Sequence, residues 1–345
     1  MTARTGTTIR FDRGPQIVAG AALVGKKEGD GPLGAAFDAI EPDATFGEPT
    51  WEQAESTLLR RTIGHAIKKA GRTPAEIDVL FSGDLQNQCA ASSFAVREFS
   101  VPFCGLFGAC STMALSLTLA AIGLDSGAFR TAVAATVSHF CTAERQFRHP
   151  LEYGGQRTPT AQWTVTGAGA AVLQRYDERA ALPQIAAVRP GTIRDLGVTD
   201  AANMGAAMAP AAKDAVAGFL RDTGAAPSDF DLILTGDLGQ VGSDLLRELL
   251  LREDGVDLGT VHNDCGLMIF DREAQDVHAG GSGCGCSASV LCAHILPRLM
   301  RGALNTVLFV ATGALLSANS ALQGQSIPGI AHAVLLTAPH GKETP

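Results

Sequence analysis

Short apolar runs alternate with longer helical segments along the whole chain. The runs at 16–24, 77–82 and 131–137 are unbroken and bounded by turn residues, which is typical of buried strands. Residues 50–71 repeat apolar positions at helical spacing behind Thr50, so they predict a capped amphipathic helix. Strands that alternate with helices favour an α/β fold, with a largely parallel sheet and helices on both of its faces.

The same pattern predicts the other elements. In the first half they are a short helix at 88–98, a strand at 101–106, a helix from 110 to about 124 and a strand at 163–173. In the second half they are a strand from 184, helices at 208–223 and 286–301, and strands at 231–235, 306–311 and 330–337. The helix from 110 is apolar almost all round, which predicts that it is buried.

The chain contains an internal duplication. The sequence IDVLFSGDLQNQ at 77–88 returns as FDLILTGDLGQV at 230–241, and each copy follows a helix-like stretch. The repeat is far longer than a solenoid unit, so it predicts two similar halves packed together. We place these halves at 1–178 and 179–345, each with the element order βαβαβαββ.

Composition narrows the classes of function. The chain has 345 residues, of which 46% are hydrophobic, and a net charge of −8, so it can bury a large core and has no basic stripe for nucleic acid. No apolar run is long enough to span a bilayer, and the first residues lack a signal-peptide core. The eight cysteines form no secreted-domain framework, which predicts free thiols in the cytosol.

Candidate chemistry begins at Cys110, in the sequence GACSTMA. A cysteine that opens a helix lies near free backbone N–H groups, which would favour the thiolate, although a buried hydrophobic role is the alternative. Asp84 and Asp237 follow the repeated strand at equivalent positions, where both could simply cap turns. Of these two, we expect only Asp84 to lie on the Cys110 side.

A second group of candidates follows the strand at 131–137. Ser138, His139 and Cys141 should lie at the carboxyl end of that strand, where open α/β sheets bind ligands. Arg148, in a loop of mixed charge, could reach an anionic ligand from there. The plainer alternatives are a histidine bound to a neighbouring carbonyl and an arginine in solvent or in an ion pair.

Metal and dinucleotide sites are not predicted. Cys284, Cys286 and His278 lack a second ligand pair at zinc-site spacing. The glycine-rich segment at 167–171 lies inside a strand rather than in a strand-turn-helix unit, so we expect no cofactor.

The duplicated halves, the GACSTMA turn and the GAGAAVL strand resemble the thiolase superfamily, in particular its 3-oxoacyl-(acyl carrier protein) synthase III branch, over the whole chain. The resemblance implies a layered α-β-α-β-α body. It also implies a histidine and an asparagine beside the catalytic cysteine. Here these positions fall on Gly236 or Asp237 and on Cys284, so both catalytic partners are replaced.

Three longer strings, at 137–173, 236–246 and 264–271, resemble one subgroup, the stage V sporulation protein AD family of spore-forming bacteria. The resemblance implies a protein without condensation chemistry. It would bind dipicolinic acid (pyridine-2,6-dicarboxylic acid), possibly with calcium, and act with SpoVA membrane subunits in loading the developing spore. It would lie on the cytoplasmic face of the spore inner membrane, and it could dimerise through the strand at 101–106.

These observations give one hypothesis and one alternative. In the first, dipicolinate lies over the helix begun by Cys110 with one carboxylate facing His139, and Asp84 orients that histidine or a cation. In the alternative, the protein is a synthase III-like acyltransferase that uses Cys110, with His139 as its base.

Overall fold

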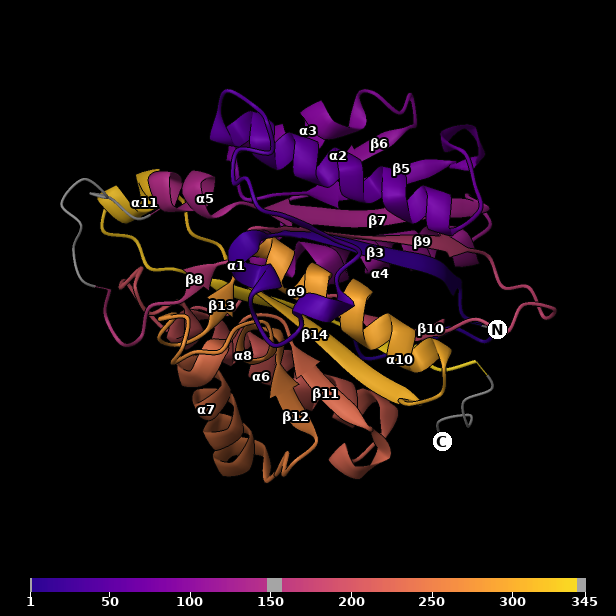
Figure 1. The fold of residues 1–345 in the computed structure, drawn as a ribbon. Coiled ribbons are helices and arrows are strands. Elements are labelled where there is room, and N and C mark those ends of the chain that lie inside the picture. The colour runs from indigo at the N-terminus through magenta and orange to yellow at the C-terminus, as the bar shows by residue number, and fades with distance from the viewer. Residues whose placement is uncertain (1, 148–156, 340–345) are drawn as a thin grey trace.

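The computed structural model describes residues 2–147 and 157–339. Its main sheet has thirteen strands, ten of which follow the hydrogen-bonded order β6-β5-β7-β9-β3 and then β10-β15-β14-β11-β12 (Figure 1). The first set comprises β3 (Gln16–Gly25), β5 (Val79–Gly83), β6 (Phe103–Gly105), β7 (Thr131–Ser138) and β9 (Gly167–Gln174). The second comprises β10 (Gln184–Arg189), β11 (Leu232–Thr235), β12 (His262–Asp264), β14 (Thr306–Ala314) and β15 (Gly329–Thr337).

The two sets repeat one topology. In the first, β5 pairs parallel with β6 and β7, and β9 pairs antiparallel with β7 and β3. In the second, β11 pairs parallel with β12 and β14, and β15 pairs antiparallel with β14 and β10. Four strands of each set therefore run in the same direction, in agreement with the largely parallel sheets expected. The boundary expected at 178 and 179 lies in the connection between β9 and β10.

Helices form three layers around these strands (Figure 1). The outer helices are α2 (Trp51–Lys69) and α3 (Ala90–Val96) on the first set, and α6 (Met204–Thr223) and α7 (Gly239–Leu249) on the second. The central layer comprises α4 (Thr112–Asp125), α9 (Cys284–Val290) and α10 (Leu296–Met300). Helix α4 contacts both β7 and β14, so it lies between the two sets of strands. The body is thus layered α-β-α-β-α, and the predicted thiolase-like fold is confirmed.

Several short elements complete the described chain. They are the strands β1 (Ala3–Thr5), β2 (Thr8–Arg10), β4 (Ala39–Glu41), β8 (Trp163–Thr164) and β13 (Gly281–Ser282), and the helices α1 (Lys26–Gly29), α5 (Phe140–Phe147), α8 (Cys265–Met268) and α11 (Ala318–Leu322). Helical turns of other types lie at η1 (Gly34–Ala36), η2 (Pro74–Glu76), η3 (Asn87–Cys89), η4 (Ala109–Ser111), η5 (Pro227–Asp229), η6 (Leu250–Asp254) and η7 (Leu291–Ile295).

Local sequence explains the main helices. The Thr50 hydroxyl accepts a hydrogen bond from the backbone N–H of Gln53 (3.3 Å) and caps α2 as predicted. Helix α4 has no polar face because strands cover it on both sides. None of the helices within 2–147 and 157–339 combines the length and the apolar character needed to cross a membrane.

Three differences from the predicted elements concern the site. The helix expected from Cys110 begins at Thr112, after the turn η4. The strand expected at 163–173 is broken, because β8 leaves the main sheet to pair with β13. Helix α5, which has no counterpart among the predicted elements, follows β7 directly and carries residues toward the Cys110 side.

Candidate functional site

The candidate site lies where the carboxyl ends of β5, β7, β11 and β14 meet the first turns of α4 and α9. Cys110 sits in the turn η4, directly after Ala109, whose φ of +48° is unusual for a residue with a side chain. The Cys284 thiol donates a hydrogen bond to the Ala109 carbonyl (3.0 Å). A strained residue at the head of a helix, held by its neighbours, is a feature of binding and catalytic sites.

Asp237 is the charged group in contact with Cys110. It is fully buried and lies close enough to Cys110 for its negative charge to raise the pKa of that thiol. Three donors reach its carboxylate, namely the hydroxyls of Thr312 (2.8 Å) and Ser282 (3.0 Å) and the backbone N–H of Gly283 (3.0 Å). The expectation that only Asp84 lies on the Cys110 side is therefore wrong.

Cys110 is a neutral thiol. Burial, and then the negative charge of Asp237, raise the pKa of the Cys110 thiol well above its usual value. The predicted thiolate is thus wrong. The physical reason is that the nearby carboxylate and the loss of water outweigh any field from the helix N-terminus.

At this site, residues of one half of the chain contact residues of the other half. Asp237, from the second half, contacts Cys110 of the first. Conversely, Asp84, from the first half, contributes to the raised pKa of Cys284, although burial is the larger cause. Each aspartate thus lies near a cysteine of the other half, because the helices of the central layer begin between the two sets of strands.

Neither Gly236 nor Cys284 supplies a base at the positions expected for the catalytic partners, whereas Asp237, the other candidate for the first position, places its carboxylate beside Cys110. A Cβ atom on Gly236 would lie 3.0 Å from the Ala311 Cα and the Thr312 N, so a larger side chain there has no space unless β14 shifts. At the other position, the Cys284 thiol is already bonded to a backbone carbonyl. Gly236 and Cys284 therefore support the structure of the site, and neither offers a group that could activate Cys110.

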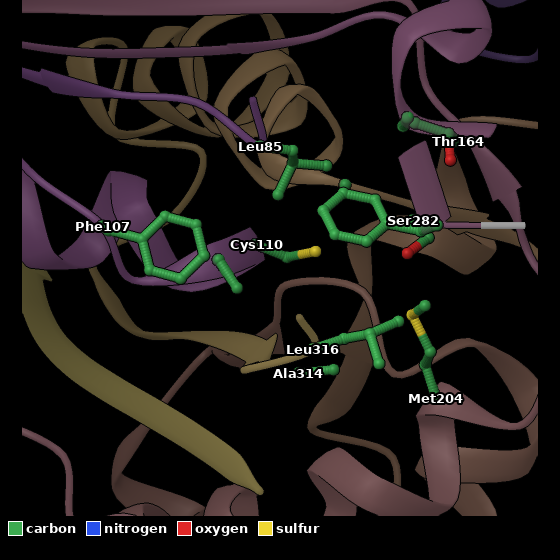
Figure 2. A pocket seen from close by; sticks show the side chains of 12 residues that line it. Leu85, Phe107, Cys110, Thr164, Met204, Ser282, Ala314 and Leu316 are labelled. Atoms are coloured by element: carbon green, nitrogen blue, oxygen red, sulfur yellow. The ribbon is translucent and has the colours of Figure 1, made fainter. Parts of the chain in front are cut away.

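A narrow cavity opens beside Cys110, whose sulfur points into it (Figure 2), and its empty space together with the solvent at its mouth amounts to about 440 Å³. Most of its lining is apolar, and the described lining residues are Leu85, Phe107, Ala109, Cys110, Ala143, Phe147, Thr164, Met204, Ser282, Gly283, Ala314 and Leu316. Among these lining residues, only Thr164 and Ser282 carry hydroxyl groups. It includes no histidine, lysine or arginine. The cavity therefore suits a small, flat, largely apolar molecule.

The His139 side chain is turned away from this cavity. Its Nδ1 accepts a hydrogen bond from the Cys141 backbone N–H (3.1 Å), so the ring proton lies on Nε2 and is donated to the Ala44 carbonyl (2.8 Å). Burial lowers the pKa of the ring, which packs against Phe46 and Trp51. His139 is thus a neutral, fully bonded histidine, as in the plainer alternative, and its ring has no nitrogen left for a ligand.

The remaining candidates support the site rather than line it. The Ser138 hydroxyl donates to the Val165 carbonyl (2.7 Å) and accepts from the Gly285 N–H (2.9 Å), which fixes the start of α9. Cys141 is half-buried, and burial raises the pKa of its thiol.

Asp84 accepts hydrogen bonds from the backbone N–H groups of Gln86 (2.8 Å) and Ser92 (2.7 Å), so it organises the loop that contains Leu85.

Arg148 lies outside the described residues. Of the candidates whose positions are described, only Cys110 lines the cavity, and the others surround it.

Sequence reasoning missed Asp237 as a contact of Cys110 and Glu55 as a buried acid. Glu55, on α2, is fully buried and has a raised pKa, mainly because of burial. Its position among apolar residues on the inner face of the predicted helix was a usable signal. In residues 2–147 and 157–339, no three His, Cys, Asp or Glu side chains are grouped as metal ligands would be.

Comparisons with known proteins connect this site to a family. Residues 5–337 match the model of stage V sporulation protein AD (SpoVAD). Stage V sporulation protein AD of Bacillus subtilis (strain 168) is 46% identical over 311 residues, which is 90% of each chain.

Solved structures share the fold at low sequence identity. The 3-oxoacyl-[acyl-carrier-protein] synthase III of Aquifex aeolicus VF5 has a TM-score of 0.57 at 13% identity, covering 94% of this chain and 100% of that one. The tetronic acid condensing enzyme AbyA1 has a TM-score of 0.58 at 19% identity, covering 94% of this chain and all of the other. The extent of the family match and the identity to the Bacillus protein lead to one conclusion: the chain belongs to the stage V sporulation protein AD family.

Proposed function

We propose that this protein binds dipicolinic acid in the Cys110 cavity, without catalysing a reaction, and takes part in loading the acid into the developing spore. One observation carries the proposal. The cysteine that would be the nucleophile is a neutral thiol beside Asp237, at the edge of a cavity whose described lining has no histidine. Membership of a sporulation protein family supports the biological setting.

The cavity has features that fit a flat aromatic acid. Phe107, Met204 and Leu316 offer apolar walls for a pyridine ring, and Thr164 and Ser282 offer polar atoms on another side (Figure 2). Binding sites for small molecules commonly combine apolar walls with a few polar groups that fix orientation. In this arrangement the ring accounts for most of the contact area, and a carboxylate takes hydrogen bonds from the hydroxyls in place of their present bonds to Glu144 and Asp237. His139, which we first expected to face the ligand, has no role in it.

Partners and location form a second part of the proposal. The protein would act at the cytoplasmic face of the spore inner membrane and pass dipicolinate, possibly with calcium, to SpoVA membrane subunits. Strand β6 ends the main sheet, and its Cys104 is exposed, so its free edge could pair with a second copy of the chain.

An acyltransferase is the second candidate. The strained Ala109 beside Cys110 and the fold shared with condensing enzymes favour it. Asp237 would then have to accept the thiol proton as the base. The raised pKa of the Cys110 thiol opposes that step, because burial disfavours the thiolate that the proton transfer would leave behind.

The two candidates predict different results with acetyl-CoA. For the binding protein, intact-mass spectrometry should detect no acetyl adduct on Cys110, because the neutral thiol is a weak nucleophile. Dipicolinate should still stabilise the same preparation against thermal unfolding. A stoichiometric adduct that disappears in the Cys110→Ser variant, with no stabilisation by dipicolinate, would favour the acyltransferase instead.

A further inference from the structure

A buried carboxyl group stands behind one wall of the cavity. Glu55 is fully buried on α2, and its Oε2 contacts the Thr142 hydroxyl (2.5 Å) and the Gln86 side-chain amide (2.8 Å). Its Oε1 is buried and has no hydrogen-bond partner. An ionised carboxylate in that position would leave half of its charge without a donor, and this is costly in a buried site.

Asp84 is a second buried carboxyl group close to Glu55. Both Asp84 oxygens accept backbone N–H groups, from Gln86 and Ser92, and this bonding stabilises its ionised form. Two carboxylates in one buried cluster repel each other, so the pair retains a proton. That proton belongs on Glu55, because one Glu55 oxygen has no donor, whereas each Asp84 oxygen accepts a backbone N–H.

No positive charge offsets the pair among the described neighbours. Strands β3, β7 and β9 and helix α3, which pack against α2, contain no titratable residue within their bounds. The titratable and charged groups around the pair are His139, which is neutral, the Cys89 and Cys284 thiols, and the ion pairs Arg145–Glu52 and Arg157–Glu144, in which α5 contributes Arg145 and Glu144. Both arginines are thus already bound to other acids.

The pair is linked to the cavity through two short connections. Thr142 belongs to α5, whose Ala143 and Phe147 line the cavity. Gln86 belongs to the loop after β5, whose Leu85 lines it. The Gln146 side chain also joins the two segments, because it donates a hydrogen bond to the Leu85 carbonyl (3.1 Å). Glu55 therefore holds one whole wall of the cavity in place.

We propose that Glu55 is a positioning residue, and that it must carry a proton for the cavity to bind its ligand. This inference rests on the proposed function and adds a regulation to the same site. When Glu55 loses its proton, its negative charge repels that of Asp84. The loop that contains Leu85 then moves away from α2, and the wall that this loop forms with α5 comes apart. Binding is then strong at neutral pH and weaker in alkaline solution.

The pH range follows from the environment of Glu55. Burial, and then the charge of Asp84, raise its pKa to about 8, so Glu55 is neutral at pH 7 and mostly ionised at pH 9. The pKa of His139 lies below its usual value and that of the Cys141 thiol above it, so neither group changes charge in most of this range.

Titration calorimetry with dipicolinate at pH 7 and pH 9 tests the proposal. The affinity of the unmodified protein should fall about tenfold by pH 9, and binding there should take up close to one proton, against almost none at pH 7. The uptake is measured by repeating the titration in buffers of different ionisation enthalpy. The Glu55→Gln variant is permanently neutral and similar in shape, so it should keep the pH 7 affinity at both pH values.

The control is Glu248→Gln, which removes an exposed acid from α7, away from α2 and α5, and should keep the pH dependence of the unmodified protein. Equal affinity at both pH values, no proton uptake at pH 9, or the same alkaline loss in Glu55→Gln would overturn this inference and leave the proposed function standing. No binding at pH 7 would instead count against the proposed function. If Glu55→Gln does not fold, proton uptake by the unmodified protein decides the question alone.

Discussion

Replacing Cys110 with tryptophan is expected to abolish dipicolinate binding, with a loss of affinity of at least about a hundredfold. The Cys110 sulfur points into the cavity, so the indole ring would occupy the space proposed for the pyridine ring (Figure 2). Equilibrium dialysis of the ligand measures the loss. Cys110→Ala should change the affinity much less, because it removes a thiol that is already engaged with Asp237 and leaves the apolar walls intact.

Cys104→Trp is the matched control for this variant. Cys104 is exposed on β6 and does not line the cavity, so the same chemical change there should leave binding unchanged. Circular dichroism must show that each variant is folded, since overpacking in a buried turn costs about 1–3 kcal/mol. Full binding by a folded Cys110→Trp variant would place the ligand elsewhere on the molecule.

The largest loss of stability is expected from Asp237→Ala. This change leaves two buried hydroxyls and a backbone N–H without their acceptor. Each unsatisfied buried donor costs about 1–3 kcal/mol, so the combined loss should reach about 3–5 kcal/mol after relaxation. The midpoint of urea unfolding measures the effect.

Asp244→Ala provides the comparison for this variant. Asp244 lies on the exposed side of α7, where its carboxylate accepts hydrogen bonds from the Gln240 side chain, so its loss should change stability by less than about 0.5 kcal/mol. If Asp237→Ala and Asp244→Ala unfolded at the same urea concentration, the carboxylate of Asp237 would not organise the site as the structure indicates.

The fold was predictable because the main strands are apolar, buried and repeated. The strands expected at 16–24 and 131–137 differ from β3 and β7 by a single residue at one end. Shorter or interrupted elements were harder to predict. Strand β12 has only three residues, two of them polar and one a histidine, and β8 separates from β9 because it pairs with the distant β13.

The site was less predictable because its contacts cross from one half to the other. The repeat places Asp84 and Asp237 at equivalent points after β5 and β11, but local sequence does not say which cysteine each will meet. That depends on how the central helices lie between the two sets of strands. His139 illustrates a second limit, since a residue after a strand can turn to either face, and here the pocket formed by Phe46 and Trp51 holds it on the outer one.

The central claim is that a thiolase-like site in this protein binds a ligand instead of performing acyl transfer. Titration calorimetry of the unmodified protein with dipicolinic acid at pH 7 tests it most directly. The account predicts saturable binding with one molecule per chain, and loss of the signal in Cys110→Trp but not in Cys104→Trp. An absence of binding heat at several temperatures, together with an unchanged melting temperature at saturating ligand, would contradict it.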